Sequence, residues 1–126
     1  MDVKRTERGW AGHFICGDRC KFRRNTLLEY EDTKIVVSTV GAYPNPKSGE
    51  PEEIGYRRYY ETMAFHAHQE GDYVEANVSR QVSFESMWAI SEIETPGIDN
   101  LANQMHEAVV AELTEKLIAG TLEVED

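Results

Sequence analysis

A short basic stretch is the first feature of the chain that could bind a ligand. Residues 19–26 read RCKFRRNT, and their cations are Arg19, Lys21, Arg23 and Arg24. Residues 1–27 carry seven Lys or Arg against three Asp or Glu, whereas the 126-residue chain has a formal net charge of −10. Guanidinium groups bind phosphate oxygens in pairs, so this patch can hold a compact anion while the acidic remainder repels long nucleic acids. Alternatively, these cations balance acidic side chains on a neighbouring strand or subunit.

A second cluster mixes arginines with aromatic rings. Residues 56–60 read YRRYY, in which Arg57 and Arg58 stand among three tyrosines. A nucleobase stacked on a ring gains about 1–3 kcal/mol, and amides bond sugar hydroxyls or base edges. Other residues with such groups are Phe84, Trp88, Asn100 and Asn103. The composition favours recognition of a nucleotide-like ligand; the simpler interpretation of YRRYY is a strand whose tyrosines pack on a loop.

Metal and covalent chemistry have weaker support. His13, Cys16 and Cys20 form H-x2-C-x3-C, but structural zinc needs four ligands, and a second pair would have to come from the distant His66 and His68. His13 and Cys16 point to opposite faces of a strand, which disfavours a Cys–His dyad. The chain has no G-x-S-x-G, P-loop or G-x-G-x-x-G motif. We therefore expect no enzyme, no catalytic residue, no metal and no cofactor.

The hydrophobic pattern indicates which elements position these groups. It predicts strands at residues 12–16, 25–30, 34–43, 59–67, 73–84 and 84–93. The proline-rich residues 43–55 are expected to form a surface loop. A helix is predicted at about 100–119. The chain is thus expected to be a single domain of residues 1–126, an α+β fold with an antiparallel β-sheet at about 10–93 and a C-terminal amphipathic helix.

One hairpin register follows from the alternation. A four-residue loop at 69–72 pairs residues whose numbers sum to 141, which sets Met63 against Val78 and Phe65 against Ala76. The same register sets Glu61 against Arg80 on the apolar face. This pair either fixes the register of the hairpin or forms the floor of a polar ligand pocket.

The helix has predicted ends and a predicted apolar face. Asp99 is the expected N-cap and Gly120 the expected stop. The apolar face contains Leu101, Met105, Ala108, Val109, Leu113 and Leu117. Val110 and Ile118 fall beside this stripe and could widen it into a surface that pairs with another subunit, so we expect a homo-oligomer.

Location follows from two absences in the sequence. No apolar run is long enough to span a membrane, and no signal-peptide pattern opens the chain. A cytoplasmic protein is the expectation, and Cys16 and Cys20 would then stay reduced.

Most of the chain resembles a known family. The blocks RGWAGHFICGDRCKFRRNTLLEY, KIVVSTVGAY, YRRYYETMAFHA and YVEANVSRQVSF, followed by a C-terminal helix, are similar to the phage-encoded Thoeris anti-defence sponge proteins, first family. The resemblance implies a viral protein in the cytoplasm of the infected bacterium. It would sequester cyclic ADP-ribose isomers without cleaving them, and so block anti-phage defence. Some family members are hexamers that also bind cyclic trinucleotides, so the resemblance implies a dimer or a hexamer.

The resemblance also implies roles for particular residues. It assigns Arg57 or Arg58 to the pyrophosphate, Phe84 or Trp88 to the adenine, and Asn100 or Asn103 to a polar ligand contact. Arg23 and Arg24 would serve a trinucleotide site where subunits meet.

Two other functions stay open at the level of sequence. The acidic net charge suits a phage inhibitor that binds a protein of another defence complex and mimics nucleic acid. A zinc-dependent enzyme would use His13, Cys16 and Cys20.

Overall fold

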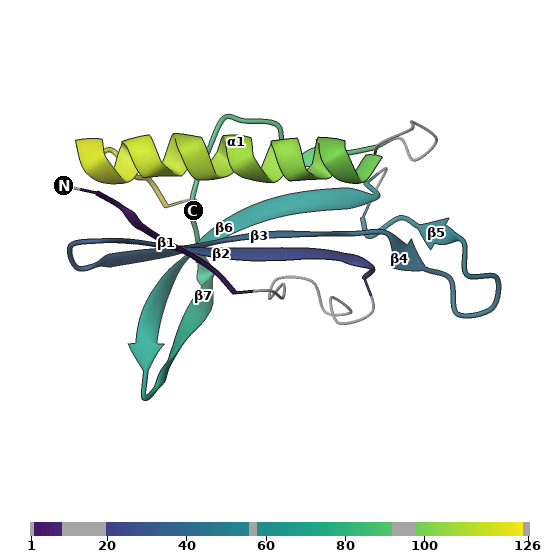
Figure 1. The fold of residues 1–126 in the computed structure, drawn as a ribbon, viewed down its shortest axis with the longest axis horizontal. Coiled ribbons are helices and arrows are strands. Elements are labelled where there is room, and N and C mark those ends of the chain that lie inside the picture. The colour runs from purple at the N-terminus through teal and green to yellow at the C-terminus, as the bar shows by residue number, and fades with distance from the viewer. Residues whose placement is uncertain (1, 9–19, 56–57, 92–97, 125–126) are drawn as a thin grey trace.

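A computed structural model describes residues 2–8, 20–55, 58–91 and 98–124. In chain order the elements are β1 (Lys4–Glu7), β2 (Phe22–Tyr30), β3 (Thr33–Gly41), β4 (Tyr43–Pro44), β5 (Pro51–Glu52), β6 (Tyr60–Glu70), β7 (Tyr73–Gln81), β8 (Ala89–Ile90) and α1 (Ile98–Ala119). The main sheet has the order β1-β2-β3-β6-β7, and β8 pairs with β6. All of its pairings are antiparallel. Helix α1 lies along one face of this sheet (Figure 1), which confirms the predicted α+β fold.

The core lies between α1 and the central strands. The apolar run predicted at 34–43 forms β3, which is buried from Ile35 to Gly41. Leu28 and Ile35 belong to a cluster with Val109 and Leu113 of α1. Each fully buried aliphatic side chain contributes about 1.5–3 kcal/mol to folding.

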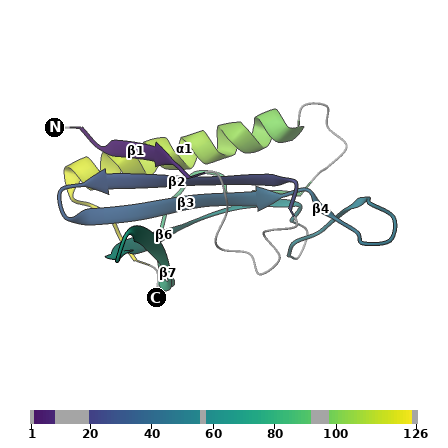
Figure 2. The same ribbon diagram turned by 60° about the horizontal axis from the view of Figure 1, so that its bottom comes forward.

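The N-terminal strand was not predicted from sequence. β1 pairs with β2 at the sheet edge (Figure 2). All four of its residues are polar and exposed. The sequence therefore lacks the alternation of apolar and polar residues by which a strand is predicted. The predicted strand 12–16 lies outside the described residues.

The predicted register of the 59–67 and 73–84 segments is wrong. Glu70 pairs with Tyr73 and Ala67 with Ala76, so two residues rather than four form the turn. Gly71 has a φ of 60°. Glycine adopts this conformation without a steric penalty because it has no Cβ, and two-residue hairpin turns require it. Beyond Ala76 the register shifts, and Phe65 pairs with Gln81.

The predicted contact between Glu61 and Arg80 is therefore also wrong. In the sheet, Glu61 pairs with Val40 on one side and Ala89 on the other. The side chain of Arg80 is exposed, whereas Glu61 has another arginine as its partner.

The 43–55 segment is more ordered than a plain loop. β4 and β5 pair within it, and Asn45 stabilises the connecting turn. Its Oδ1 accepts hydrogen bonds from the amides of Lys47 at 2.8 Å and Ser48 at 3.1 Å. Asparagine favours turns because its short side chain can bond the backbone in this way.

The C-terminal helix has the predicted end but not the predicted start. Gly120 has a φ of 71°, and the amide of Thr121 donates to the carbonyl of Lys116 at 3.0 Å, so the helix stops where expected. It begins at Ile98, one residue before Asp99, so Asp99 lies within the helix and is not its N-cap. In the part of the chain that the structure describes, no helix combines the length and the hydrophobicity needed to cross a membrane.

The two residues placed beside the apolar stripe differ in burial. Val110 is buried in the core cluster, so it does not extend a surface patch as predicted. Ala108, predicted on the apolar face, is exposed. Ile118 is 52% exposed, as expected of a residue off the stripe.

Candidate ligand-binding site

A pocket lies beside β6, between the end of β7 and the start of β8. Its volume is about 410 Å³, and its lining residues are Arg58, Glu61, Thr62, Met63, Gln81, Phe84 and Trp88. Two backbone hydrogen bonds hold the rim to β6: the Thr62 amide donates to the Trp88 carbonyl at 2.7 Å, and the Val82 amide to the Ala64 carbonyl at 2.8 Å. The segment between Val82 and Trp88 is thus held to β6 at both ends, and it contributes Phe84 and Trp88 to the lining of the pocket.

Arg58 supplies the positive charge of this pocket. Its Nε lies 2.7 Å from Oε2 of Glu61, but the N–H is not aligned for a hydrogen bond, so the contact is an ion pair. The guanidinium carbon lies 5.2 Å from the centroid of the Trp88 ring system, within cation–π range. Glu61 is buried, and this partner makes its burial tolerable.

Local backbone structure positions Arg58. The Arg58 amide donates to the Gly55 carbonyl at 3.0 Å, and the Ile54 amide donates to the Arg58 carbonyl at 2.7 Å. A Cβ at Gly55 would collide with the guanidinium of Arg58. Glycine at this position therefore lets the arginine lie across the backbone.

Two aromatic residues border the pocket from the segment that follows β7. Phe84 is partly buried and packs against the core cluster. Trp88 is 46% exposed, so its ring is accessible to a ligand. The structure thus brings together three of the predicted residues, Arg58, Phe84 and Trp88.

Glu112 of α1 anchors the aromatic segment. Its carboxylate accepts hydrogen bonds from the amides of Glu85 and Ser86, each at 2.8 Å, and from the Ser86 hydroxyl at 2.6 Å. Lys116 forms an ion pair with it at 2.8 Å. Burial opposes ionisation of Glu112, but these hydrogen bonds outweigh it and lower the pKa to about 2.

Sequence analysis did not identify this role of Glu112. The spacing of Glu112 and Lys116, four residues apart, was the available signal of an ion pair. Nothing in the pattern indicated that residues 85 and 86 would lie beside it.

The predicted asparagines lie elsewhere. Asn100 is exposed near the start of α1, and neither Asn100 nor Asn103 lines the pocket. Asn103 lies near Arg24, with 3.4 Å between Arg24 Nη1 and Asn103 Oδ1. Arg57 lies outside the described residues.

Arg24 belongs to a compensated ion cluster. Its Nη2 lies 2.7 Å from Glu7 and 2.9 Å from Glu107, and Arg5 binds the same two carboxylates. The hydrogen bond from Arg5 is the main reason that the pKa of Glu107 falls to about 2. Arg24 therefore balances acidic side chains of neighbouring elements, which was the alternative interpretation of the basic stretch. Arg23 is exposed and, as the adjacent strand residue, points to the opposite face.

A buried chain of hydrogen bonds connects this cluster to the pocket. Thr26 Oγ1 donates to Glu7 at 2.6 Å, so its oxygen accepts from Nε2–H of His106 at 2.7 Å. Nδ1 of His106 then accepts from Thr39, which accepts from Thr62, both at 2.7 Å. The direction follows because an ionised carboxylate can only accept. Thr62 is a pocket residue.

The zinc ligands considered as an alternative from sequence do not come together among the described residues. Cys20 packs against Val40, whereas His66 pairs with Ile35 at the other end of β3. Five residues of a strand span about 16 Å, too far for one zinc ion. His13 and Cys16 lie outside the described residues.

Comparisons with protein-family models, with curated proteins and with solved structures find no significant match to this chain. Membership of the sponge family therefore stays a prediction.

Proposed function

We propose that the protein captures a cyclic ADP-ribose-type nucleotide in the Arg58 pocket and holds it without cleaving it. The observation that carries this proposal is the convergence of Arg58, Phe84 and Trp88 on one cavity. Arg58 precedes β6, whereas Phe84 and Trp88 belong to the segment that follows β7, and each was singled out for phosphate or base recognition.

The size and composition of the pocket support a ligand of this class. A volume of about 410 Å³ lies within the roughly 300–1,000 Å³ typical of small-molecule sites. The ligand carries two phosphates, an adenine and two riboses. Arg58 suits the pyrophosphate, the rings of Phe84 and Trp88 suit the base, and the Gln81 amide suits a ribose hydroxyl.

The described lining residues favour binding over turnover. Glu61 is the one carboxylate among them, and Arg58 already holds it. Thr62 contributes the one hydroxyl, which is hydrogen-bonded to Thr39. A nucleophile with a separate general base is not found among these residues. Sequestration needs slow release of the ligand rather than chemistry.

The direct test is capture and release of intact ligand. We expect the purified protein to bind cyclic ADP-ribose isomers in calorimetry and to release them unchanged on heating, as judged by mass spectrometry. Phe84→Ala is expected to weaken binding at least about tenfold, because stacking on a ring contributes about 1–3 kcal/mol. Arg58→Lys keeps a charge for Glu61 but loses the planar fork, so it should also weaken binding.

Lys47→Gln is the matched control, since Lys47 is exposed in the β4–β5 turn, outside the pocket; its affinity should equal that of the unmodified protein. Recovery of a cleaved nucleotide would exclude sequestration. Absence of binding to every isomer tried would exclude the ligand class.

The trinucleotide site inferred from the resemblance remains a prediction. A cyclic trinucleotide at Arg23 and Arg24 would have to compete with Glu7 and Glu107 for the guanidinium of Arg24. It would also require a homo-oligomer, which sedimentation of the purified protein would test.

A further inference from the structure

The strand β7 contains a large bulge opposite His66. Ala67 pairs with Ala76 and Phe65 pairs with Gln81, so the four residues Asn77 to Arg80 stand opposite His66 alone. Asn77 closes the bulge, because its Oδ1 accepts from the Ser79 amide at 3.2 Å and from the Ser79 hydroxyl at 2.7 Å. Bulges of this kind redirect side chains and are frequent beside functional sites.

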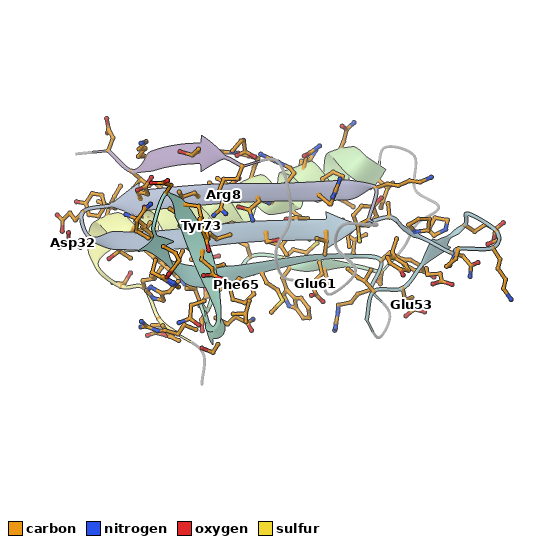
Figure 3. The ribbon with its side chains drawn as sticks, turned by 90° about the horizontal axis from the view of Figure 1, so that it is seen from below. Arg8, Asp32, Glu53, Glu61, Phe65 and Tyr73 are labelled. Carbon is orange, nitrogen blue, oxygen red and sulfur yellow. The ribbon has the colours of Figure 1, made fainter. Side chains whose placement is uncertain are left out.

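The bulge forms one wall of a second pocket. Its volume is about 200 Å³, and its lining residues are Asp32, Thr33, Lys34, His66, Ala67, His68, Asn77 and Arg80. None of them lines the Arg58 pocket. Figure 3 shows Asp32 at one end of the sheet, well apart from Glu61. The two pockets are therefore separate sites on the same strand, β6.

Hydrogen-bond donors dominate this second pocket. Arg80, Lys34, the two imidazoles, the Thr33 hydroxyl and the Asn77 amide can all donate. Lys34 pairs with Glu29 at 3.2 Å, and His68 lies 3.3 Å from Glu70 and 3.8 Å from Glu75. Among the described residues, Arg80 has no carboxylate within ion-pairing distance.

His66 adds a second donor next to Arg80. Burial lowers the pKa of His66, and the charge of Arg80 lowers it further, so the imidazole is neutral at pH 7. The other charged or titratable groups around His66 are Asp32, Lys34 and His68 in the bulge pocket, and Lys116 of α1, which lines a further cavity that His66 also borders. A neutral imidazole still donates one hydrogen bond, and an anion placed between it and Arg80 would relieve the repulsion that opposes its protonation.

We propose that the bulge pocket is a second binding site, which takes a phosphate group through Arg80, Lys34 and His66. The volume admits a tetrahedral oxyanion with a small substituent but not a whole dinucleotide. Arginine offers two parallel N–H groups to phosphate oxygens, and Lys34 adds a point charge. The ligand is either inorganic phosphate or a phosphomonoester of a small molecule.

The test is a titration of the full-length protein followed by NMR at pH 7 and constant ionic strength. The two probes are inorganic phosphate and glycerol 3-phosphate. We expect saturable shifts of the His66 ring and of the amides of residues 77–81, together with a rise in the pKa of His66. Tighter binding of glycerol 3-phosphate would identify an esterified ligand, and equal or tighter binding of inorganic phosphate would identify the free ion.

Variants locate the site and separate it from the first pocket. Arg80→Gln should weaken phosphate binding at least about tenfold, and because Arg80 is exposed the melting temperature should change little. His66→Gln provides a second variant of the same site, and Lys47→Gln removes an equal charge elsewhere. Phe84→Ala should leave phosphate binding intact, so failure of the nucleotide proposal would not affect this result. Linear, non-saturating shifts, or equal affinity of Arg80→Gln and the unmodified protein, would overturn the proposal.

Discussion

Glu112 controls the aromatic wall of the Arg58 pocket without lining the pocket itself. Three groups of residues 85 and 86 donate to its carboxylate, and these residues directly follow Phe84. A hydrogen bond to a charged group contributes about 1.5–3 kcal/mol, so a single carboxylate on α1 holds the segment that presents the rings. Glu112 is therefore a positioning residue.

Glu112→Gln should loosen this segment. We expect a loss of unfolding free energy of about 1–3 kcal/mol, because the neutral amide accepts these hydrogen bonds less strongly, and a loss of nucleotide affinity of several-fold. Denaturant unfolding and calorimetry would measure the two effects. The control is Glu115→Gln on the exposed side of the same helix; equal losses in both variants would show that helix charge, and not anchoring, is responsible.

The strand β6 is the element on which both pockets depend. It pairs with β3, β7 and β8, and it carries Glu61, Thr62 and Met63 for one pocket and His66, Ala67 and His68 for the other. At the start of the strand, the ring of Tyr60 packs edge-on against Phe22 at 5.6 Å between centroids. The same ring lies over Gly41 of β3, where a side chain would collide with it.

Gly41→Ala tests the packing of this strand. The added methyl would collide with the Tyr60 ring and lie 2.8 Å from the Tyr59 carbonyl oxygen, and the backbone cannot move aside easily. We expect a loss of about 1–3 kcal/mol in unfolding free energy and weaker nucleotide binding, since Tyr60 adjoins Glu61.

Gly49→Ala offers a contrast to this variant. It places the methyl in open space at a φ of 75°, so it should cost only about 1 kcal/mol and leave binding unchanged. A Gly41→Ala protein as stable as the unmodified one would contradict the steric argument.

At the scale of the whole molecule, a buried histidine couples stability to pH. His106 is fully buried between β2, β3 and α1. Burial lowers its pKa from 6.5 to about 4, and Arg24 adds to the effect. His106 therefore binds a proton near pH 6.5 in the unfolded chain, but only near pH 4 in the folded protein. Protonation favours unfolding, so this stability is complete above pH 6.5 and is lost as the pH falls toward 4.

The unfolding free energy should fall by about 2 kcal/mol between pH 6.5 and 4.5 on account of His106. His106→Gln can still bond Thr26 and Thr39 but does not titrate, so it should be less stable at pH 7 and show a much flatter pH dependence. Urea unfolding at several pH values would measure the slope. His66→Gln is the comparison, because the pKa of His66 is also lowered; an unchanged slope in His106→Gln would disprove the assignment.

Arg58, Phe84 and Trp88 could be listed as candidates from sequence because of their chemistry, but Asn100 and Asn103 were candidates on the same grounds and lie outside the pocket. The apolar run of β3 and the end of α1 at Gly120 were likewise predictable, since local propensity and hydrophobic period fix them. What only the tertiary structure decided are contacts between distant segments: Arg58 rather than Arg80 beside Glu61, Glu112 beside residues 85 and 86, and Arg24 between Glu7 and Glu107. The physical reason is that a two-residue turn, a bulge and an all-polar edge strand produce no periodic hydrophobic pattern in the sequence. Each of them nevertheless changes which side chains come into contact.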